Sequence, residues 1–367
     1  MKLLKVNLFS CLVGAVLLAL LLAPAVAQAQ GAWSVVSSPS PGSENELNGV
    51  ASVSANDVWA VGDTDQQTLA EHWNGSAWSV VASPNASSND ALLGVAAVST
   101  NDVWAVGKVN TATPPLIEHW NGTSWRLVKA PRQVGFLNGV TAVSTNDVWA
   151  VGDFVSSGVD QTLIEHWNGH KWSVVSSPNV ASQNNFLNGV TALSANNIWA
   201  VGFAETSFSE QTLTLHWDGT SWSMVSSPNV AGSVTDTLQA AAAVSSTDVW
   251  AVGQFIIGSS VQTLIEQWNG TSWSVVSSPA AGLLQGIAIV SATDIWAVGD
   301  FVDPNTGATT TVIEQWNGTA WSVVTSPNPS ASENILKAAA ADPSSGQAWA
   351  VGSFFSNGRQ TLTEFNP

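Results

Sequence analysis

A glutamate followed by a histidine recurs along the sequence, and both side chains can transfer protons or bind metal ions. The pairs begin at Glu71, Glu118 and Glu165. Metal binding requires several ligands that converge on one ion, and glycoside hydrolysis requires two carboxyl groups on opposite sides of one bond. Equivalent residues of successive repeats are instead distributed around a ring or along an array. We therefore expect structural roles for these pairs.

The amino acid at the histidine position indicates hydrogen bonding. Histidine is replaced by glutamine later in the chain, and both side chains can donate a hydrogen bond. His170 lies in an expected hairpin turn and would be solvated. The positions are His72, His119, His166 and His216, followed by Gln267 and Gln315. The glutamates beside them are Glu71, Glu118, Glu165, Glu266, Glu314 and Glu364.

Acidic residues in expected loops give a catalytic alternative. A hydrolase or lyase that acts on polysaccharide would need two carboxyl groups at one mouth of the domain. The loop candidates are Asp63, Asp153, Asp300 and Asp303. Residues 303–307 also resemble a calcium loop, with oxygen ligands at alternate positions, but they lack the distal glutamate of an EF-hand and are equally compatible with a turn. We expect no metal and no cofactor.

These residues belong to a repeat built around the phrase Asp-Val-Trp-Ala-Val-Gly. Its tryptophans are Trp59, Trp104, Trp149, Trp199, Trp250, Trp296 and Trp349. A period of about 40–50 residues is typical of propeller blades or helical arrays. The chain lacks the apolar periodicity of helices, and each repeat contains four short β-rich stretches separated by Asn, Asp, Gly, Ser and Pro. The sequence predicts an all-β fold, a seven-bladed β-propeller.

The third repeat shows the expected form of a blade. Its strands are predicted at Gly139–Ser144, Asp147–Gly152, Thr162–Trp167 and Lys171–Ser176. Asn168-Gly169 is a strong hairpin signal between the last two strands, because both residues tolerate a positive φ. Four antiparallel strands in each unit are typical of a propeller blade.

The tryptophans indicate how the ring closes. All 20 fall into a second-strand class of seven, a third-strand class of six and a fourth-strand class of seven. Trp33 belongs to the fourth-strand class but precedes the first repeat, whereas the last repeat stops in its third strand. We therefore expect Ala32–Ser38 to complete the last blade beside Gln360–Phe365, which would close the ring and remove an exposed sheet edge. The tryptophans would pack between blades.

The phrase Val-Trp-Ala-Val-Gly, followed by Ile-Glu-His-Trp-Asn-Gly-Thr-Ser-Trp, resembles the blades of secreted bacterial β-propellers. The resemblance is to the superfamily of BNR/Asp-box and photosystem-assembly-factor-like repeats, and more loosely to kelch and tectonin repeats. It covers about residues 32–367 and implies the propeller architecture. The Asp-box itself, Ser-x-Asp-x-Gly-x-x-Trp, is not reproduced; residues 144–149 come nearest to it.

Enzymes of similar architecture need residues that this chain lacks. Sialidases of this kind use a tyrosine nucleophile and three arginines that grip a carboxylate, and galactose-oxidase-like enzymes use a tyrosine–cysteine cofactor. The chain has no tyrosine, and its arginines are Arg126, Arg132 and Arg359. The residue inventory therefore excludes both activities.

The N-terminal residues have the pattern of a secretory signal peptide. Two lysines precede an apolar run over residues 8–26, and small residues follow it. A retained membrane anchor is the alternative. We expect residues 1–29 to be a signal peptide and residues 30–367 to be a single secreted propeller domain. The only cysteine, Cys11, would leave with the signal, so the mature chain could form no disulfide.

Charge limits the class of partner. Lys2 and Lys5 lie in the signal, so the mature chain would keep seven of nine basic residues against 26 acidic ones, a formal charge of −19. Such a surface repels phosphate backbones and anionic lipid headgroups. We expect no nucleic-acid binding and no membrane insertion after signal removal. An extracellular glycan or protein remains as the ligand, and we expect a monomer.

Loop lengths predict a binding surface on one side. The connections between second and third strands vary in length, as do those between blades, and both kinds emerge on the same face of a blade. Solvent-exposed loops could also vary without a function. Polar residues near the start of the innermost strands would form a collar at Asn48, Asn138, Asn188, Gln239, Gln285 and Lys337, with Leu93 in the second repeat. Aromatic residues just past the second strands would flank it at Phe154, Phe203, Phe255, Phe301, Phe354 and Phe355.

The leading hypothesis is a non-enzymatic extracellular binding propeller that recognises a carbohydrate or a protein at this surface. Its ligand-binding candidates are Asn48, Asn138, Asn188, Gln239, Gln285, Lys337, Phe154, Phe255 and Phe301. A polysaccharide-acting hydrolase or lyase is the second hypothesis, and a structural protein of the cell surface is the third.

Overall fold

The computed structural model describes residues 32–109, 113–206 and 208–367. Ala32–Pro367 form one compact unit. The predicted signal peptide, residues 1–29, lies outside the described residues. Every regular element in the described part of the chain is a β-strand, so the expected all-β class is confirmed. No helix in that part could cross a membrane.

The strands recur in sets of four. The first strands are β2 (Asn45–Ser54), β6 (Asp90–Ser99), β10 (Phe136–Ser144), β14 (Asn184–Ser194), β18 (Thr235–Ser245), β22 (Leu283–Ser291) and β26 (Asn334–Asp342). The second strands are β3 (Asp57–Thr64), β7 (Asp102–Val109), β11 (Asp147–Ser156), β15 (Asn197–Glu205), β19 (Asp248–Ile257), β23 (Asp294–Val302) and β27 (Gln347–Phe355). The third strands are β4 (Gln67–Trp73), β8 (Leu116–Trp120), β12 (Val159–Trp167), β16 (Glu210–Trp217), β20 (Ser260–Trp268), β24 (Thr309–Trp316) and β28 (Arg359–Asn366). The fourth strands are β5 (Trp78–Val80), β9 (Trp125–Leu127), β13 (Trp172–Val174), β17 (Trp222–Val225), β21 (Trp273–Val275), β25 (Trp321–Val324) and, from the start of the chain, β1 (Ser34–Val35).

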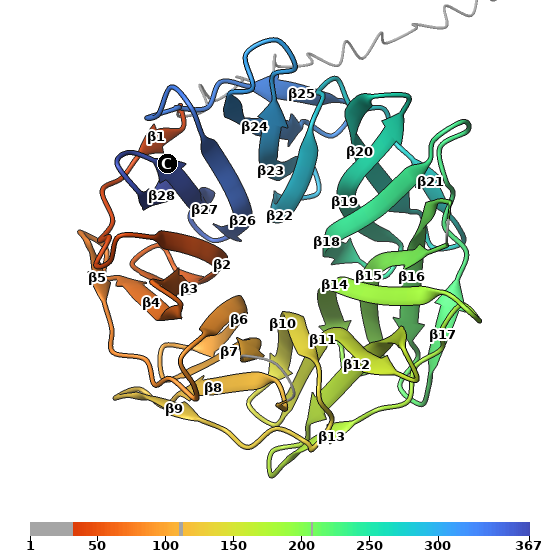
Figure 1. The fold of residues 1–367 in the computed structure, drawn as a ribbon, viewed down its shortest axis with the longest axis horizontal. Coiled ribbons are helices and arrows are strands. Elements are labelled where there is room, and N and C mark those ends of the chain that lie inside the picture. The colour runs from red at the N-terminus through yellow and green to blue at the C-terminus, as the bar shows by residue number, and fades with distance from the viewer. Residues whose placement is uncertain (1–31, 110–112, 207) are drawn as a thin grey trace, which may run out of the picture. The chain divides into compact units, whose positions relative to one another are not determined.

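Antiparallel sheets are arranged around a common centre, with the first strand of each innermost (Figure 1). Four sheets follow the chain order: β2–β5, β6–β9, β10–β13 and β22–β25. Another contains β26, β27 and β28 with β1 at its edge. The sets β14–β17 and β18–β21 share one sheet because Glu210 of β16 pairs in parallel with Thr235 of β18. Each set of four is called a blade below and is named by its strands.

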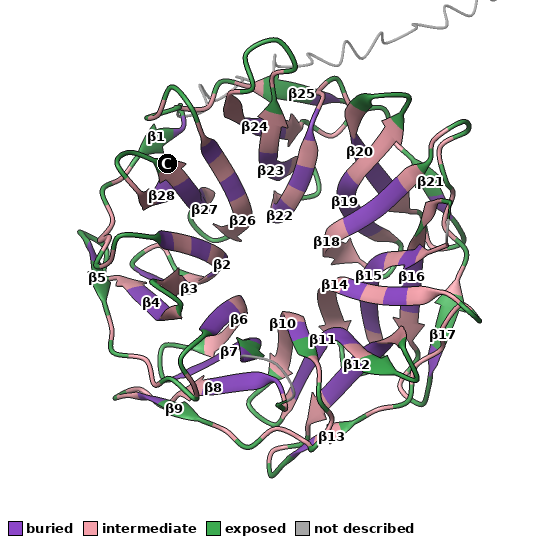
Figure 2. Cartoon of the chain, in the orientation of Figure 1, coloured by how far each residue is buried: buried purple, intermediate pink, exposed green. Residues whose placement is uncertain are grey.

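The strands of the β10–β13 blade differ in length from the prediction. The first three extend further toward the loop after β11, because Ser156 pairs directly with Val159. The two residues between them, Ser157 and Gly158, have φ angles of 53° and 80°. Two positive φ angles are what a type I′ hairpin turn requires. The fourth strand, Trp172–Val174, is shorter than predicted. Figure 2 shows exposed residues on outer strands such as β1 and β17 and on many of the loops.

The glycine of the repeat phrase is required by a close approach of two strands. In the β10–β13 blade, a β-bulge shifts the pairing of β10 with β11 between Leu137 and Gly139. A Cβ built on Gly152 would lie only 2.0 Å from the carbonyl oxygen of Phe136. Any other residue at position 152 would displace backbone, so the bulge explains the recurrence of glycine at this point.

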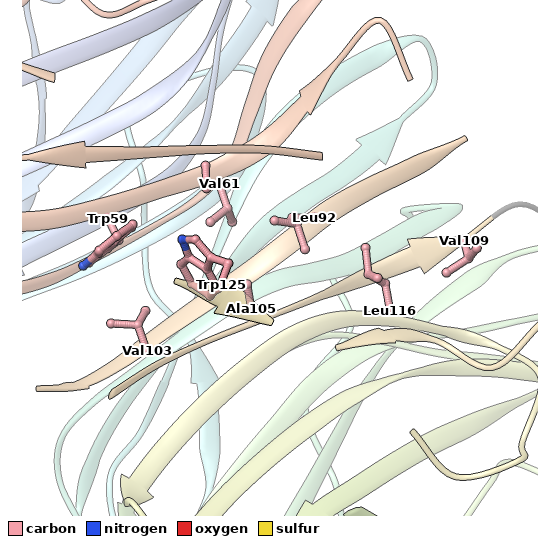
Figure 3. Close-up of a cluster of buried hydrophobic side chains, with 9 residues drawn as sticks. Trp59, Val61, Leu92, Val103, Ala105, Val109, Leu116 and Trp125 are labelled. Atoms are coloured by element: carbon pink, nitrogen blue, oxygen red, sulfur yellow. The ribbon is translucent and has the colours of Figure 1, made fainter. Parts of the chain in front are cut away.

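Hydrophobic side chains fill the space between neighbouring blades. Figure 3 shows one such cluster, in which Trp59 of β3 meets Leu92 of β6 and Trp125 of β9. The ring centroid of Trp59 lies 5.3 Å from that of Trp125 and 4.8 Å from that of Trp120. The first pair packs edge-to-face and the second is tilted, which are favourable arrangements for aromatic rings at these distances. The expected packing role of the tryptophans accounts for these contacts.

The first and last strands of the described chain lie side by side. Ser34 pairs with Phe365 and Val35 pairs with Glu364. The backbone N–H of Val36 donates to the carbonyl of Thr363 at 2.9 Å. Trp33 packs edge-to-face against Trp296 of β23, with ring centroids 5.2 Å apart.

The histidines bond to the first residue of the repeat phrase. His72, His119 and His166 each place Nε2 2.8 Å from the Oδ1 of an aspartate at the start of the second strand. His216 meets the Oδ1 of Asn197 at 2.9 Å. Gln267 donates to Asp248 at 2.8 Å in the same way. The expected hydrogen-bonding role explains why glutamine can replace histidine at this position in two later blades.

We expect His166→Gln to leave the stability of the protein nearly unchanged, because glutamine makes the same bond in other blades. His166→Ala should cost about 1–3 kcal/mol, since it removes one of the two donors to Asp147 Oδ1 and leaves only the Nε1–H of Trp149, at 2.8 Å. It also removes the ring that stacks on Trp149 with centroids 4.1 Å apart. Urea unfolding of both variants checks this. Equal losses would contradict the hydrogen-bonding role.

Candidate functional site

The two faces of the blades carry different kinds of connection. Because β2, β3, β4 and β5 are antiparallel in order, the loop after β3 and the connection from β5 to β6 lie on one side. We call this side the variable-loop face. The turns at residues 55–56 and 74–77 lie on the other side, the tight-turn face, where Trp73 Nε1 donates to the carbonyl of Ala55 at 3.3 Å. The same strand order applies to every blade.

The predicted collar residues are all β-bulge residues near the variable-loop face. Each follows a buried leucine in the first strand, at the point where pairing with the second strand shifts by one residue. The bulged residues are Asn48, Leu93, Asn138, Asn188, Gln239, Gln285 and Lys337. A bulge leaves one residue outside the regular pairing and re-aims its side chain. The side chain of the bulged residue is therefore not needed for packing within the sheet, and in six of the blades it is polar.

Most of these bulge residues meet around a central cavity of about 180 Å³. Asn48, Leu93, Asn188, Gln239, Gln285 and Lys337 line it, together with the small residues that follow each of them. Asn138 is not among the lining residues, although Gly139 beside it is. The structure thus brings five of the six predicted polar collar residues to one cavity.

Several collar amides also hold adjacent blades together. The Nδ2 of Asn48 donates to the carbonyl of Leu92 in the next blade at 3.0 Å. Asn138 and Asn188 make the same bond to the next blade at 2.9 Å each. Lys337 links two blades, with its Nζ 2.8 Å from Glu46 and 3.1 Å from the Oδ1 of Asn48. The collar is therefore partly structural, because these donors already have partners.

Three carboxyl groups surround the collar. Asp63, Asp153 and Asp300 accept hydrogen bonds from Asn48, Asn138 and Gln285, with donor–acceptor distances of 3.3, 3.4 and 2.6 Å. Burial raises the pKa of Asp153 to about 6 and raises the pKa of Asp63 and of Asp300 above the usual range. They occupy equivalent positions in three different blades, β2–β5, β10–β13 and β22–β25.

All the predicted aromatic residues except Phe355 are half-buried. Phe154, Phe255 and Phe301 each pack against a hydrophobic cluster between blades. Phe203 stacks on Phe186 with ring centroids 4.8 Å apart. The more exposed aromatic side chains are those of Phe136, Phe208 and Phe355, and the first two were not singled out from the sequence. Phe208 follows the second strand of its blade by only a few residues, which is the signal that could have identified it.

A second cavity on this face was not predicted. It has a volume of about 420 Å³ and lies between the β18–β21 and β22–β25 blades. Val261, Leu283, Phe301 and Pro304 contribute apolar walls, and Asp300 is also a lining residue, with its carboxyl group bonded to the collar residue Gln285. Of the predicted site residues, Phe301 lines this cavity. A cavity of this size with few polar groups is typical of a ligand site.

The candidate calcium loop is closed by its own hydrogen bonds. Asp303 accepts from the backbone N–H of Asn305 at 2.8 Å and from the hydroxyl of Thr306 at 3.0 Å. The N–H of Gly307 donates to the carbonyl of Asp303 at 2.8 Å. These contacts are those of a turn. The described residues contain no group of three or more His, Cys, Asp or Glu side chains that could hold a metal ion.

The glutamates of the recurring pairs are fully buried away from solvent. Burial raises the pKa to about 8 for Glu71, Glu118, Glu165, Glu266 and Glu364. Some accept a hydrogen bond from a serine hydroxyl in the Ser-Pro connection of the preceding blade. For example, the hydroxyl of Ser83 donates to Glu118 at 2.6 Å. In Glu71 neither carboxyl oxygen has a partner among the described residues. These groups are components of the core and face no cavity of the variable-loop side described above.

Comparison with known proteins identifies the fold. No protein-family model and no curated protein matches the chain. Solved structures that resemble it include YCF48 from Cyanidioschyzon merolae, at 17% identity and a TM-score of 0.58, with 92% of this chain and 99% of that chain covered. YCF48 bound to D1 peptide resembles it at 13% identity and a TM-score of 0.57, covering 91% and 96%.

The third similar structure is the GH74 xyloglucanase from Xanthomonas campestris, at 13% identity and a TM-score of 0.58. The match covers 90% of this chain but 55% of that protein, so this chain spans about half its length. At these identities the likeness concerns the fold alone. It confirms the β-propeller architecture that the repeat predicted.

Proposed function

We propose that the protein is a non-enzymatic binding propeller whose ligand, a protein segment, docks on the variable-loop face. The observation that carries the proposal is the convergence of two cavities on that face, one at the collar and one beside Phe301. Binding sites commonly lie on variable loops that a rigid scaffold positions. The carboxyl groups Asp63, Asp153 and Asp300 each accept a hydrogen bond from the collar amide of their own blade, which supports a structural role for them rather than a catalytic one.

A protein ligand is favoured over a glycan by the state of the aromatic residues. Sugar rings are commonly held on exposed aromatic faces. The second- and fourth-strand tryptophans are buried between blades, and Phe154, Phe255 and Phe301 are half-buried, so Phe208 and Phe355 are the exposed rings past the second strands. The charge of the chain, −17 as a whole, disfavours nucleic acid. A carbohydrate ligand is the alternative, and the test below distinguishes it from a protein ligand.

The scaffold proposed for this function is a closed ring of seven blades. Two observations support it: β1 pairs with β28, and Trp349 of β27 contacts Trp73 of the β2–β5 blade with ring centroids 4.9 Å apart. We further propose that residues 1–29 are removed on secretion and that residues 30–367 act as one extracellular domain. Mass determination of the N-terminus of the exported protein would test the cleavage site.

The test uses a random peptide library displayed on phage and, in parallel, a glycan array. The protein carries Cys11→Ser, so that a single cysteine introduced elsewhere can be coupled to a maleimide-linked polymer. Ser259→Cys places the polymer at the cavity on the variable-loop face, and Ala292→Cys places it on the tight-turn face of a neighbouring blade. Both residues are exposed, so neither change should affect folding.

Coupling at position 259 should weaken the binding of selected peptides at least tenfold, and coupling at position 292 should leave it unchanged. The proposal fails if no peptide is selected, if both couplings leave binding intact, or if the array alone gives specific binding. The last result would instead assign the face to a carbohydrate.

A further inference from the structure

In most blades the end of the second strand is paired by the first strand of the same blade. The residue concerned stands three positions after the glycine of the repeat phrase, and its partner is the first residue of the first strand or the residue before it. The pairs are Asp65 with Glu44, Glu205 with Asn184, Ile256 with Thr235 and Phe355 with Glu333. In the first and last pairs the N–H of the second-strand residue donates to the partner's carbonyl, at 2.8 and 3.0 Å. The chain thus covers this edge itself in four blades.

In the β22–β25 blade the first strand stops short of this position. The pairing of β22 with β23 ends at Leu283 and Asp300. The residue before Leu283, Gly282, turns toward the preceding blade, where its N–H donates to the carbonyl of Val261 at 3.2 Å. Within the described chain, Val302 is therefore left without a first-strand partner.

The backbone groups of Val302 face the side that β22 leaves uncovered. The N–H of the next residue, Asp303, donates to the carbonyl of Ala308 at 2.9 Å, toward β24. Successive residues of an antiparallel strand direct their N–H and C=O groups to opposite edges. The N–H and C=O of Val302 therefore point away from β24, and we call them the open edge of β23. A free donor and acceptor on a strand edge can pair with a strand from another chain.

The β10–β13 blade has a second edge of this kind, at Val155, where the pairing of β10 with β11 stops next to Gly135. The connections that enter these two blades have eight and seven residues, 128–135 and 276–282, whereas those of the other blades have nine. With fewer residues to span, the chain joins the first strand later. Of the two edges, the one at Val302 borders the cavity of about 420 Å³ described above.

The cavity beside the open edge suits an apolar side chain. Val261, Leu283, Phe301 and Pro304 form its apolar walls, and the side chain of Val302 is itself 55% exposed. An extended peptide paired with β23 would direct alternate side chains to the two faces of the sheet, so that one of them would enter the cavity. Burial of that side chain would supply affinity, and the backbone bonds would fix the direction of the peptide.

We infer that an extended segment of the protein partner adds to the open edge of β23 as a short strand and places a large apolar side chain, such as that of leucine or phenylalanine, in this cavity. The segment takes the place that Glu333 occupies beside Phe355 in the last blade. Its backbone accepts from the N–H of Val302 and donates to the carbonyl of Val302. Because Pro304 has no N–H, the pairing is confined to this point of the edge. The inference rests on the proposed function, because it names the binding mode and the ligand chemistry of the same face.

The first test changes the peptide and leaves the protein as it is. Peptides selected on phage are synthesised with a fluorophore and with a methyl group on one backbone nitrogen at a time. Methylation of the nitrogen that donates to Val302 should weaken binding about 5- to 10-fold, because one hydrogen bond is lost. The nitrogens on either side point away from β23 and are the control. Replacing the large apolar residue by alanine should weaken binding about 10- to 100-fold.

The second test changes the edge. Val302→Pro removes the N–H that faces the open edge and breaks no bond within the blade. It should weaken peptide binding at least about tenfold, because the peptide loses its donor and its approach is hindered. Val155→Pro makes the same change at the other open edge and is the matched control, which should leave binding unchanged. Thermal unfolding checks that both variants are folded.

Amide hydrogen exchange reports on the edge directly. In the free protein the N–H of Val302 should exchange at least about tenfold faster than that of Phe355, which is bonded to Glu333. Saturating peptide should slow exchange at Val302 and leave Val155 as it was. The inference is wrong, and the proposed function stands, if the polymer at position 259 blocks the peptides but they slow no exchange at Val302 and tolerate Val302→Pro. Weaker binding to Val155→Pro alone would also contradict it. If no peptide is selected, both are wrong.

Discussion

Deletion of Ala32–Ser38 should lower the melting temperature of the protein by about 10 °C or more. The segment supplies β1 and the buried indole of Trp33, which is 4% exposed. Burying a tryptophan removes about 150–250 Å² from water, which corresponds to roughly 4–6 kcal/mol before entropy. A change of 1 kcal/mol shifts the melting temperature by about 2–4 °C in domains of 150–250 residues, and by somewhat less in larger ones.

Hydrogen bonds add to this expected loss. The hydroxyl of Thr361 lies 2.7 Å from the hydroxyl of Ser38, and the backbone N–H of Val36 donates to the carbonyl of Thr363 at 2.9 Å. Deletion would also expose the backbone of β28 as a free sheet edge, which favours aggregation. Scanning calorimetry and light scattering measure the two effects.

Two point variants separate packing from chain length. Trp33→Ala should account for about 3–5 kcal/mol. Val35→Ala, in the same strand but 44% exposed, should cost less than about 1 kcal/mol. If the deletion left the melting temperature unchanged, the pairing of the two chain ends would contribute nothing to stability, and the closed-ring scaffold would be contradicted.

The free energy of unfolding should fall as the pH rises from about 4.5 to about 8. The pKa of Glu71, Glu118, Glu165, Glu266 and Glu364 is raised to about 8 by burial, whereas in the unfolded chain it has its usual value of 4.5. In this range the unfolded chain loses protons that the folded chain keeps, so stability decreases with pH. Below the unfolded pKa both states are protonated, and this contribution is fully present.

One glutamate is sufficient for the measurement. Since one pKa unit corresponds to about 1.4 kcal/mol, Glu71→Gln should stabilise the protein by a few kcal/mol at pH 8 and by little at pH 4.5. Glutamine has nearly the same shape and cannot ionise. Glu44→Gln, in an exposed position, is the control and should leave the pH dependence unaltered.

Glu314 provides an internal comparison. Both of its carboxyl oxygens lie within hydrogen-bonding distance of the Ser278 hydroxyl, at 2.7 and 2.8 Å. This hydrogen bond lowers the pKa of Glu314 and so counters the rise caused by burial. Glu314→Gln should therefore stabilise the protein less than Glu71→Gln at pH 8. Urea unfolding at a series of pH values measures these differences. A Glu71→Gln variant less stable than the parent at pH 8 would show that the buried group is ionised and compensated.

The sequence predicted the blade because each of its parts has a local signature. Trp59 and its equivalents mark the second strand, and turns such as Asn168-Gly169 mark the hairpins. The hydrogen-bonding role of His166 followed from its replacement by Gln267 in a later repeat. In the turn, only Gly169 has a positive φ, at 87°, while the Asn168 side chain accepts the N–H groups that follow it.

The site was predicted less completely, because it depends on the register of strand pairing and on positions where a blade lacks a residue that other blades have. That Asn48 and Asn138 are bulge residues, bonded to the next blade, is a property of strand pairing that no composition reveals. The cavity beside Phe301 borders Gly282, which stands where five of the blades have a buried Asn or Asp and where the β10–β13 blade has Gly135. Alignment of the repeats on the bulge would have shown that replacement, and it is the signal that the sequence did contain.

The most direct test of the account is a crystal structure of the protein with a peptide selected on phage. We predict that the peptide lies on the variable-loop face, in contact with residues that line the collar cavity or the cavity beside Phe301. A peptide bound on the tight-turn face, or on the outer strands, would contradict the assignment of this face as the binding surface.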